Sequence, residues 1–134
     1  MKIMLDTNVL ISILIFDSKT LKNMLVNITD KHSLILSSYV IEELHNVIYR
    51  KFPNRIYDLD IFLYNLPFEI LYTPKTLLNK IIQIRDKKDI PVLNSAMMAD
   101  VDIFIAGDKD SEDIILSKPK ILTPTEFIQK FKIY

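Results

Sequence analysis

The sequence predicts an α/β fold in which helices cover a parallel β-sheet. Short apolar runs alternate along the chain with longer segments whose apolar residues recur at helical spacing, and this alternation is typical of parallel sheets. The length of 134 residues suits one domain with a single core. Residues 1–134 are therefore expected to form one domain.

The first half of the chain is expected to supply three strands. Residues 2–5 form a short apolar run, and residues 6–8 (DTN), which are of types that cap helix starts, are expected to end this strand at Asp6. The next two apolar runs, residues 34–36 and 68–72, are expected to be the second and third strands. Apolar spacing predicts helices over residues 9–16 and 18–28, from Ser37-Ser38 to Pro53, and over residues 56–66.

The second half is expected to supply two more strands. Helices are expected over residues 73–84 and 90–99, followed by a buried strand over residues 103–106 and a short strand over residues 120–122. Thr123 and Glu126 have the spacing of a capping box, with proline at the first helical position, so a last helix is expected from there to Lys130.

Composition excludes several classes of protein. The chain has no cysteine, which excludes a disulfide framework, a cysteine-ligated metal and a thiol nucleophile. A single glycine, Gly107, excludes a dinucleotide fingerprint or a P-loop, since both need several glycines. No apolar run is long enough to cross a bilayer, and no cleavable signal is visible, so we expect a cytoplasmic protein. The formal net charge is zero, so a polyanion would need a local basic patch.

Carboxylates are the side chains most suited to chemistry here. In open parallel sheets, ligand sites form beyond the carboxyl ends of strands where the strand order reverses. Asp6 and Asp108 follow predicted strands, and Asp110 extends the second of these loops. Asp89 at a helix start and Glu43 on a helix face could converge with them.

Two neighbouring glutamates of the third predicted helix are distinguished by its helical wheel. At about 100° per residue, the apolar arc centres near Leu44, so Glu43 lies at the border of the arc. Glu42 falls close to the opposite, solvated side. Only Glu43 is expected to point into a cleft.

Several carboxylates in one pocket favour a divalent cation. Like charges at close range raise one another's pKa, and a cation relieves that repulsion. Oxygen ligands without cysteine or histidine favour Mg²⁺ or Mn²⁺. Phosphodiester hydrolysis by a metal-activated water is the chemistry that this ligand set predicts.

Four segments, in this order, resemble the motifs of PIN-domain ribonucleases, many of which are toxins of toxin–antitoxin pairs. They are residues 4–10 (MLDTNVL), 41–44 (IEEL), 87–93 (KKDIPVL) and 105–110 (IAGDKD). Residues 121–127 (ILTPTEF) are similar to the closing segment of one PIN subgroup. Ser111 departs from that subgroup, which usually has an aromatic residue or leucine after the last aspartate.

The resemblance implies a three-layer α/β/α fold, with a central parallel sheet of strand order 3-2-1-4-5, and a magnesium-dependent nuclease (hydrolase) site. The implied catalytic residues are Asp6, Glu43, Asp89 and Asp108. The implied metal ligands are Asp6, Asp89, Asp108 and Asp110, supported by Thr7 and Asn8. The implied partners are an RNA substrate, an antitoxin protein and a second copy of the chain in a homodimer. Lys87, Lys88 and Arg50 are candidate RNA contacts.

Other interpretations remain open at this point. Asp6 and Asp89 could simply cap helices, and Asp108 and Asp110 could be turn residues. A PIN-like module that binds RNA or protein without cutting has the same fold. A receiver domain that accepts phosphate is disfavoured because Asp6 stands alone where paired acids are needed, and a DxD phosphatase because Asn8 replaces the second acid. His32 and His45 are expected to face solvent and are given no role.

Overall fold

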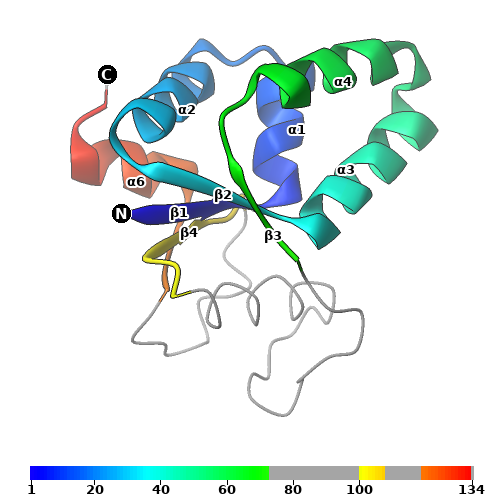
Figure 1. Ribbon diagram of the computed structural model, residues 1–134. Helices are drawn as coiled ribbons and strands as arrows, with labels where there is room; N and C mark the ends of the chain where they lie inside the picture. The colour runs from blue at the N-terminus through cyan, green and yellow to red at the C-terminus, as the bar shows by residue number, and fades with distance from the viewer. Residues whose placement is uncertain (73–99, 108–118, 134) are drawn as a thin grey trace.

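The computed structural model describes residues 1–72, 100–107 and 119–133 of the chain. Its strands form one sheet in the order β3-β2-β1-β4-β5, and every pairing is parallel (Figure 1). The strands are β1 (Lys2–Leu5), β2 (Ser33–Ser37), β3 (Glu69–Leu71), β4 (Ile103–Ile105) and β5 (Lys120–Leu122). The predicted parallel α/β fold and the strand order 3-2-1-4-5 are confirmed.

Helices flank this sheet. The described helices are α1 (Thr7–Ile15), α2 (Lys19–Lys31), α3 (Ser38–Lys51), α4 (Ile56–Asn65), α6 (Pro124–Phe131) and the 3₁₀ helix η1 (Pro53–Arg55). Figure 1 shows α1 to α4 on one side of the sheet, and α6 packs against α2 and β5. The predicted helices over residues 73–84 and 90–99 lie outside the described residues.

Side-chain caps fix the starts of α3 and α6 as expected, and the Ser18 hydroxyl likewise caps α2. The Ser37 hydroxyl accepts hydrogen bonds from the backbone N–H groups of Tyr39 and Val40, at 3.0 and 3.4 Å, and so starts α3. At α6, Thr123 and Glu126 form the predicted reciprocal capping box. These local bonds set where each helix leaves the edge of the sheet.

The start of α1 and the end of α2 differ from expectation. The Leu10 N–H donates to the Asp6 carbonyl at 3.3 Å, so α1 begins at Thr7 and not at residue 9. Helix α2 continues past residue 28 to Lys31, and the Thr29 hydroxyl bonds back to the Leu25 carbonyl at 3.1 Å. At both ends, polar residues are included in the helix because backbone N–H groups bond to carbonyls four residues earlier, Leu10 to Asp6 and His32 to Ile28.

The core lies around the three central strands. Ile3, Met4 and Leu5 of β1 are fully buried, because β1 is paired on both edges by β2 and β4. Ile48 of α3 and Phe127 of α6 are also fully buried. None of the helices in the described ranges is long and apolar enough to span a membrane.

The expectation that His32 faces solvent is only partly met. It follows α2 as its C-terminal cap and is partly buried, and its ring lies edge-on to Phe131 with centroids 6.0 Å apart. Burial, the positive N-terminus and Lys31, in that order, lower the pKa of His32 below its ordinary value of 6.5. The N-terminal amino group lies 3.4 Å from Nδ1.

We expect this depressed pKa to make stability depend on pH. The unfolded chain binds a proton at His32 more readily than the folded chain, so stability is complete above pH 6.5 and falls as pH decreases below that value. His32→Gln should flatten this part of the curve. Urea denaturation of both proteins between about pH 5 and pH 8 measures the effect, and equal pH slopes would contradict it.

Candidate active site

Asp6 lies at the carboxyl end of the central strand β1. Its N–H donates to the Ile105 carbonyl of β4 at 3.0 Å, which holds its backbone in the parallel ladder, and the residue is partly buried. Asp6 occupies the N-cap position of α1, but its side chain makes no capping hydrogen bond. Capping therefore does not explain this carboxylate.

The strand order reverses beside Asp6. From β1 the chain passes through α1 and α2 to β2 on one side, whereas β4 lies on the other side of β1. The pairing of Leu5 with Ile105, continued by one residue, sets Asp6 beside Ala106. Such a switch point is where ligand sites form in open parallel sheets.

Gly107 brings the end of β4 against the start of α1. A Cβ atom built on Gly107 would lie 3.6 Å from the Cβ of Asn8, an ordinary contact distance. The motif around residue 107 and the motif around Asp6 are thus neighbours in space, as the sequence analysis expected. Asp108, which follows Gly107 in the chain, lies outside the described residues.

Glu43 belongs to α3, which begins at the same edge of the sheet. The helix starts at the carboxyl end of β2, where Ser37 caps it, and Glu43 lies in its second turn. Helix α3 packs against α1. Glu43 is partly buried whereas Glu42 is exposed, which confirms the difference in burial predicted from the helical wheel, while a cleft at Glu43 stays a prediction.

Thr7 and Asn8 differ in their surroundings. Thr7 is 2% exposed, and its hydroxyl makes no hydrogen bond that the described structure contains. A buried hydroxyl without a partner is unfavourable, so such groups are more often found where a ligand or a further polar group completes them. Asn8 is exposed and borders a pocket.

The remaining predicted site residues belong to segments outside the described part of the chain. Asp89, Asp108, Asp110, Lys87 and Lys88 lie outside the described residues. Within the described ranges, no group of three or more acidic or histidine side chains is close enough to hold a metal. The joint metal site therefore stays a prediction, and Asp6 and Glu43 are its two described acidic members.

Arg50 lies in the last turn of α3 and is exposed. It is two helical turns, or about 10 Å along the axis, beyond Glu43 and on nearly the same side of the helix. Its predicted contact would thus be with RNA that extends along α3 away from Asp6. His45 is on the exposed side of α3, away from Glu43, with Nε2 3.6 Å from Asp60.

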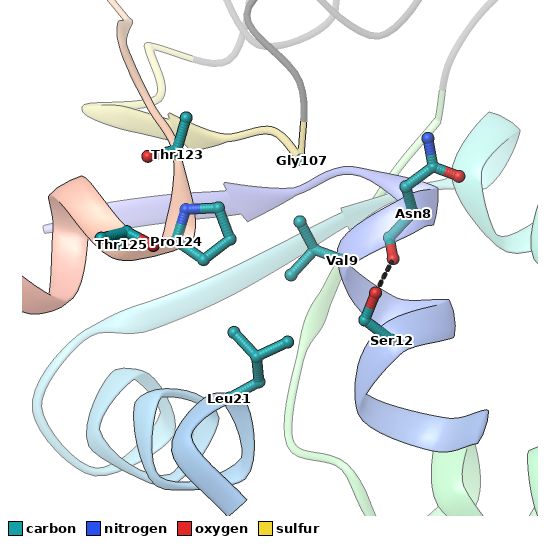
Figure 2. Close-up of a pocket in the computed structure, with 8 residues that line it drawn as sticks. All are labelled: Asn8, Val9, Ser12, Leu21, Gly107, Thr123, Pro124 and Thr125. Atoms are coloured by element: carbon teal, nitrogen blue, oxygen red, sulfur yellow. Dashed lines mark hydrogen bonds between the residues drawn. The ribbon is translucent and has the colours of Figure 1, made fainter. Parts of the chain in front are cut away.

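A pocket of about 590 Å³ opens beside this edge of the sheet, and Figure 2 shows it between α1, α2 and the start of α6. Its lining residues are Asn8, Val9, Ser12, Leu21, Gly107, Thr123, Pro124 and Thr125. This pocket was not predicted from the sequence. The one sequence feature that could have pointed to it is the spacing of Asn8 and Ser12, which are one helical turn apart and therefore share a face of α1.

The fold and site define a class of protein: a parallel α/β domain with a carboxylate, that of Asp6, at its switch point. A family model of the PIN domain matches residues 2–110, and the chain belongs to the PIN domain family. No protein of curated function matches the sequence significantly.

Two solved structures have a similar fold. A chain of VapBC2 from Rickettsia felis, bound to a DNA fragment from its promoter, superimposes with a TM-score of 0.71 at 21% identity, over 91% of this chain and 97% of that one. A chain of DNA-bound VapBC from Salmonella typhimurium gives a TM-score of 0.69 at 16% identity, over 92% and 98%. This likeness confirms the PIN-like three-layer fold.

Proposed function

We propose that this protein is a metal-dependent endoribonuclease, which hydrolyses RNA phosphodiester bonds with a carboxylate-bound Mg²⁺ or Mn²⁺ and an activated water. The observation that carries the proposal is Asp6, a partly buried carboxylate at the switch point whose side chain does not cap the helix that follows. Membership of the PIN domain family supports the same conclusion.

The donor chemistry around Asp6 fits a hard divalent cation. Asp6 and Glu43 offer carboxylate oxygens, and in this proposal Asp89, Asp108 and Asp110 complete the set. The buried Thr7 hydroxyl, which has no partner in the described ranges, fits a site that a ligand or a further carboxylate completes. A bound metal would supply a water of lowered pKa and offset charge on the phosphoryl oxygens.

The chain's own residues would hold and orient the reacting groups. The Asp6 backbone is fixed through its N–H bond to Ile105, so its carboxylate starts from the end of the central strand β1. In this proposal Glu43 approaches from α3, and Thr7 and Asn8 orient carboxylates or water. Lys87, Lys88 and Arg50 would contact RNA phosphates on either side of the cut.

Toxin activity is part of the proposal. The sequence motifs resemble those of PIN toxins, and the two similar folds come from VapBC structures. We propose that an antitoxin protein restrains this chain, that the chain forms a homodimer, and that it acts on cytoplasmic RNA.

A manganese titration tests the metal site without a guess about the substrate. Calorimetry of Mn²⁺ into the metal-stripped protein is expected to show saturable binding, which an Asp6→Asn, Asp108→Asn double variant loses. Asp60→Asn, an exposed α4 substitution outside the proposed site, is the matched control and should bind as the parent does. Circular dichroism establishes that each variant is folded.

Cleavage of structured RNA then separates the enzyme from a silent binding module. The parent should cut RNA with Mg²⁺ or Mn²⁺, and EDTA should stop the reaction. If the folded parent neither binds Mn²⁺ alone nor cuts RNA with metal present, the metal-dependent mechanism is wrong and the non-cutting module is favoured.

A further inference from the structure

We propose that the pocket beside Asp6 binds the base and ribose of an RNA nucleotide next to the cleaved bond, and thereby selects where RNA is cut. This inference rests on the proposed function. This α1–α6 pocket is lined by residues of α1, α2 and the start of α6, together with Gly107. Its volume of about 590 Å³ falls in the usual range of small-molecule sites.

The walls favour a neutral ligand group. None of the described lining residues is charged, so a phosphate would find no cation among them. Val9, Leu21 and Pro124 are turned toward the hollow in Figure 2 and give it an apolar floor. In RNA, the neutral parts that can pack on an apolar floor are the base and the ribose.

The rim of the pocket carries a hydrogen-bonding group whose direction is fixed. The Ser12 hydroxyl donates to the Asn8 carbonyl at 3.0 Å, so it has acceptor lone pairs left for a ligand. The Thr123 hydroxyl accepts from the Glu126 N–H at 3.2 Å and is turned toward α6 in Figure 2, so it is not counted as a ligand group. The anchored acceptor of Ser12 suits the donor groups that the edge of a base carries.

The location of the pocket links it to the proposed cleavage site. Asn8 is two residues after Asp6, and Gly107 directly precedes Asp108 in the chain. A nucleotide whose phosphate lies at the carboxylates can therefore reach the pocket with its base. Thr125, at the exposed end of the rim, is placed to contact the outer edge of that base.

The first test uses the four ribonucleosides, adenosine, guanosine, cytidine and uridine, with no metal added. At least one of them should shift the backbone amide NMR signals of Ser12, Leu21 and Thr125 in a saturable manner. Leu21→Phe, which fills the pocket, should weaken that binding by about tenfold or more, the scale of a steric change in an apolar pocket. Val26→Phe is the matched control, because Val26 is on the same helix but 57% exposed and outside the pocket lining.

The second test maps cleavage of an RNA of mixed sequence. Leu21→Phe should change the bases found next to the cuts or raise KM, and Val26→Phe should do neither. Thr125→Val, which removes one exposed hydroxyl, repeats the test if Leu21→Phe does not fold. The pocket proposal is overturned if no nucleoside shifts these signals and both pocket variants cut at the parental positions with the parental KM.

The two proposals fail in different ways. If a nucleoside binds the pocket but the chain does not cut RNA, the ribonuclease proposal fails and the pocket remains a nucleoside site. If the chain cuts RNA but the pocket variants change nothing, the ribonuclease proposal holds and the pocket proposal fails.

Discussion

Glu43→Gln is expected to slow RNA cleavage by on the order of 10²- to 10³-fold, the scale seen when one preorganised electrostatic group is removed from an active site. Glutamine keeps the size of the side chain and removes its charge, so the partly buried position of Glu43 stays filled. The loss should appear mainly in kcat, measured with excess Mg²⁺ or Mn²⁺ and a labelled RNA.

Glu42→Gln provides the matched control for this measurement. Glu42 is the adjacent residue of α3, but its side chain is exposed, and the same chemical change there should leave kcat within about twofold, as for surface substitutions away from a site. Equal rates for the two variants would show that Glu43 has no part in the reaction, whatever the role of Asp6.

Phe127→Ala is expected to lower the free energy of unfolding by about 3–5 kcal/mol, the usual cost of removing a large buried aromatic side chain. Phe127 is fully buried and lies against Phe131, with ring centroids 4.7 Å apart. The cavity would remove the main packing contact between α6 and the core. At this chain length the melting temperature should fall by roughly 4 °C for each kcal/mol lost.

Phe131→Ala distinguishes burial from simple loss of an aromatic ring. Phe131 is on the same helix and packs on the core, but it is only partly buried, so its removal should cost clearly less. Urea denaturation of both variants gives the two free energies. A similar loss at the two positions would mean that the contact between the rings, and not burial of Phe127, supports α6.

The features that the sequence could predict are those with a local physical cause. The reciprocal bonds of Thr123 and Glu126 depend on residues three apart, so spacing alone revealed them. Glu43 and Glu42 could be separated because the apolar positions of α3 define which side is buried. The parallel sheet followed from the alternation of strands and helices, but its strand order came from the family resemblance.

The features that could not be predicted depend on contacts between distant segments. Asp6 is anchored by its N–H bond to the Ile105 carbonyl, and no residue type near Asp6 encodes that partner. The α1–α6 pocket joins α1 and α2 to residues after β4 and β5. Its lining side chains are ordinary helix and loop residues, and only the fold gives them a common surface.

The pairing of β1 with β4 also controls when the proposed site can exist during synthesis of the chain. Residues 2–5 are synthesised before residues 103–105, which complete one edge of β1. Until then Asp6 lacks the Ile105 carbonyl that anchors it, and Gly107 is not yet beside Asn8. A chain interrupted before residue 103 would contain Asp6 and Glu43 but no switch point between β1 and β4, so partial products of translation would lack the assembled site that the proposed function requires.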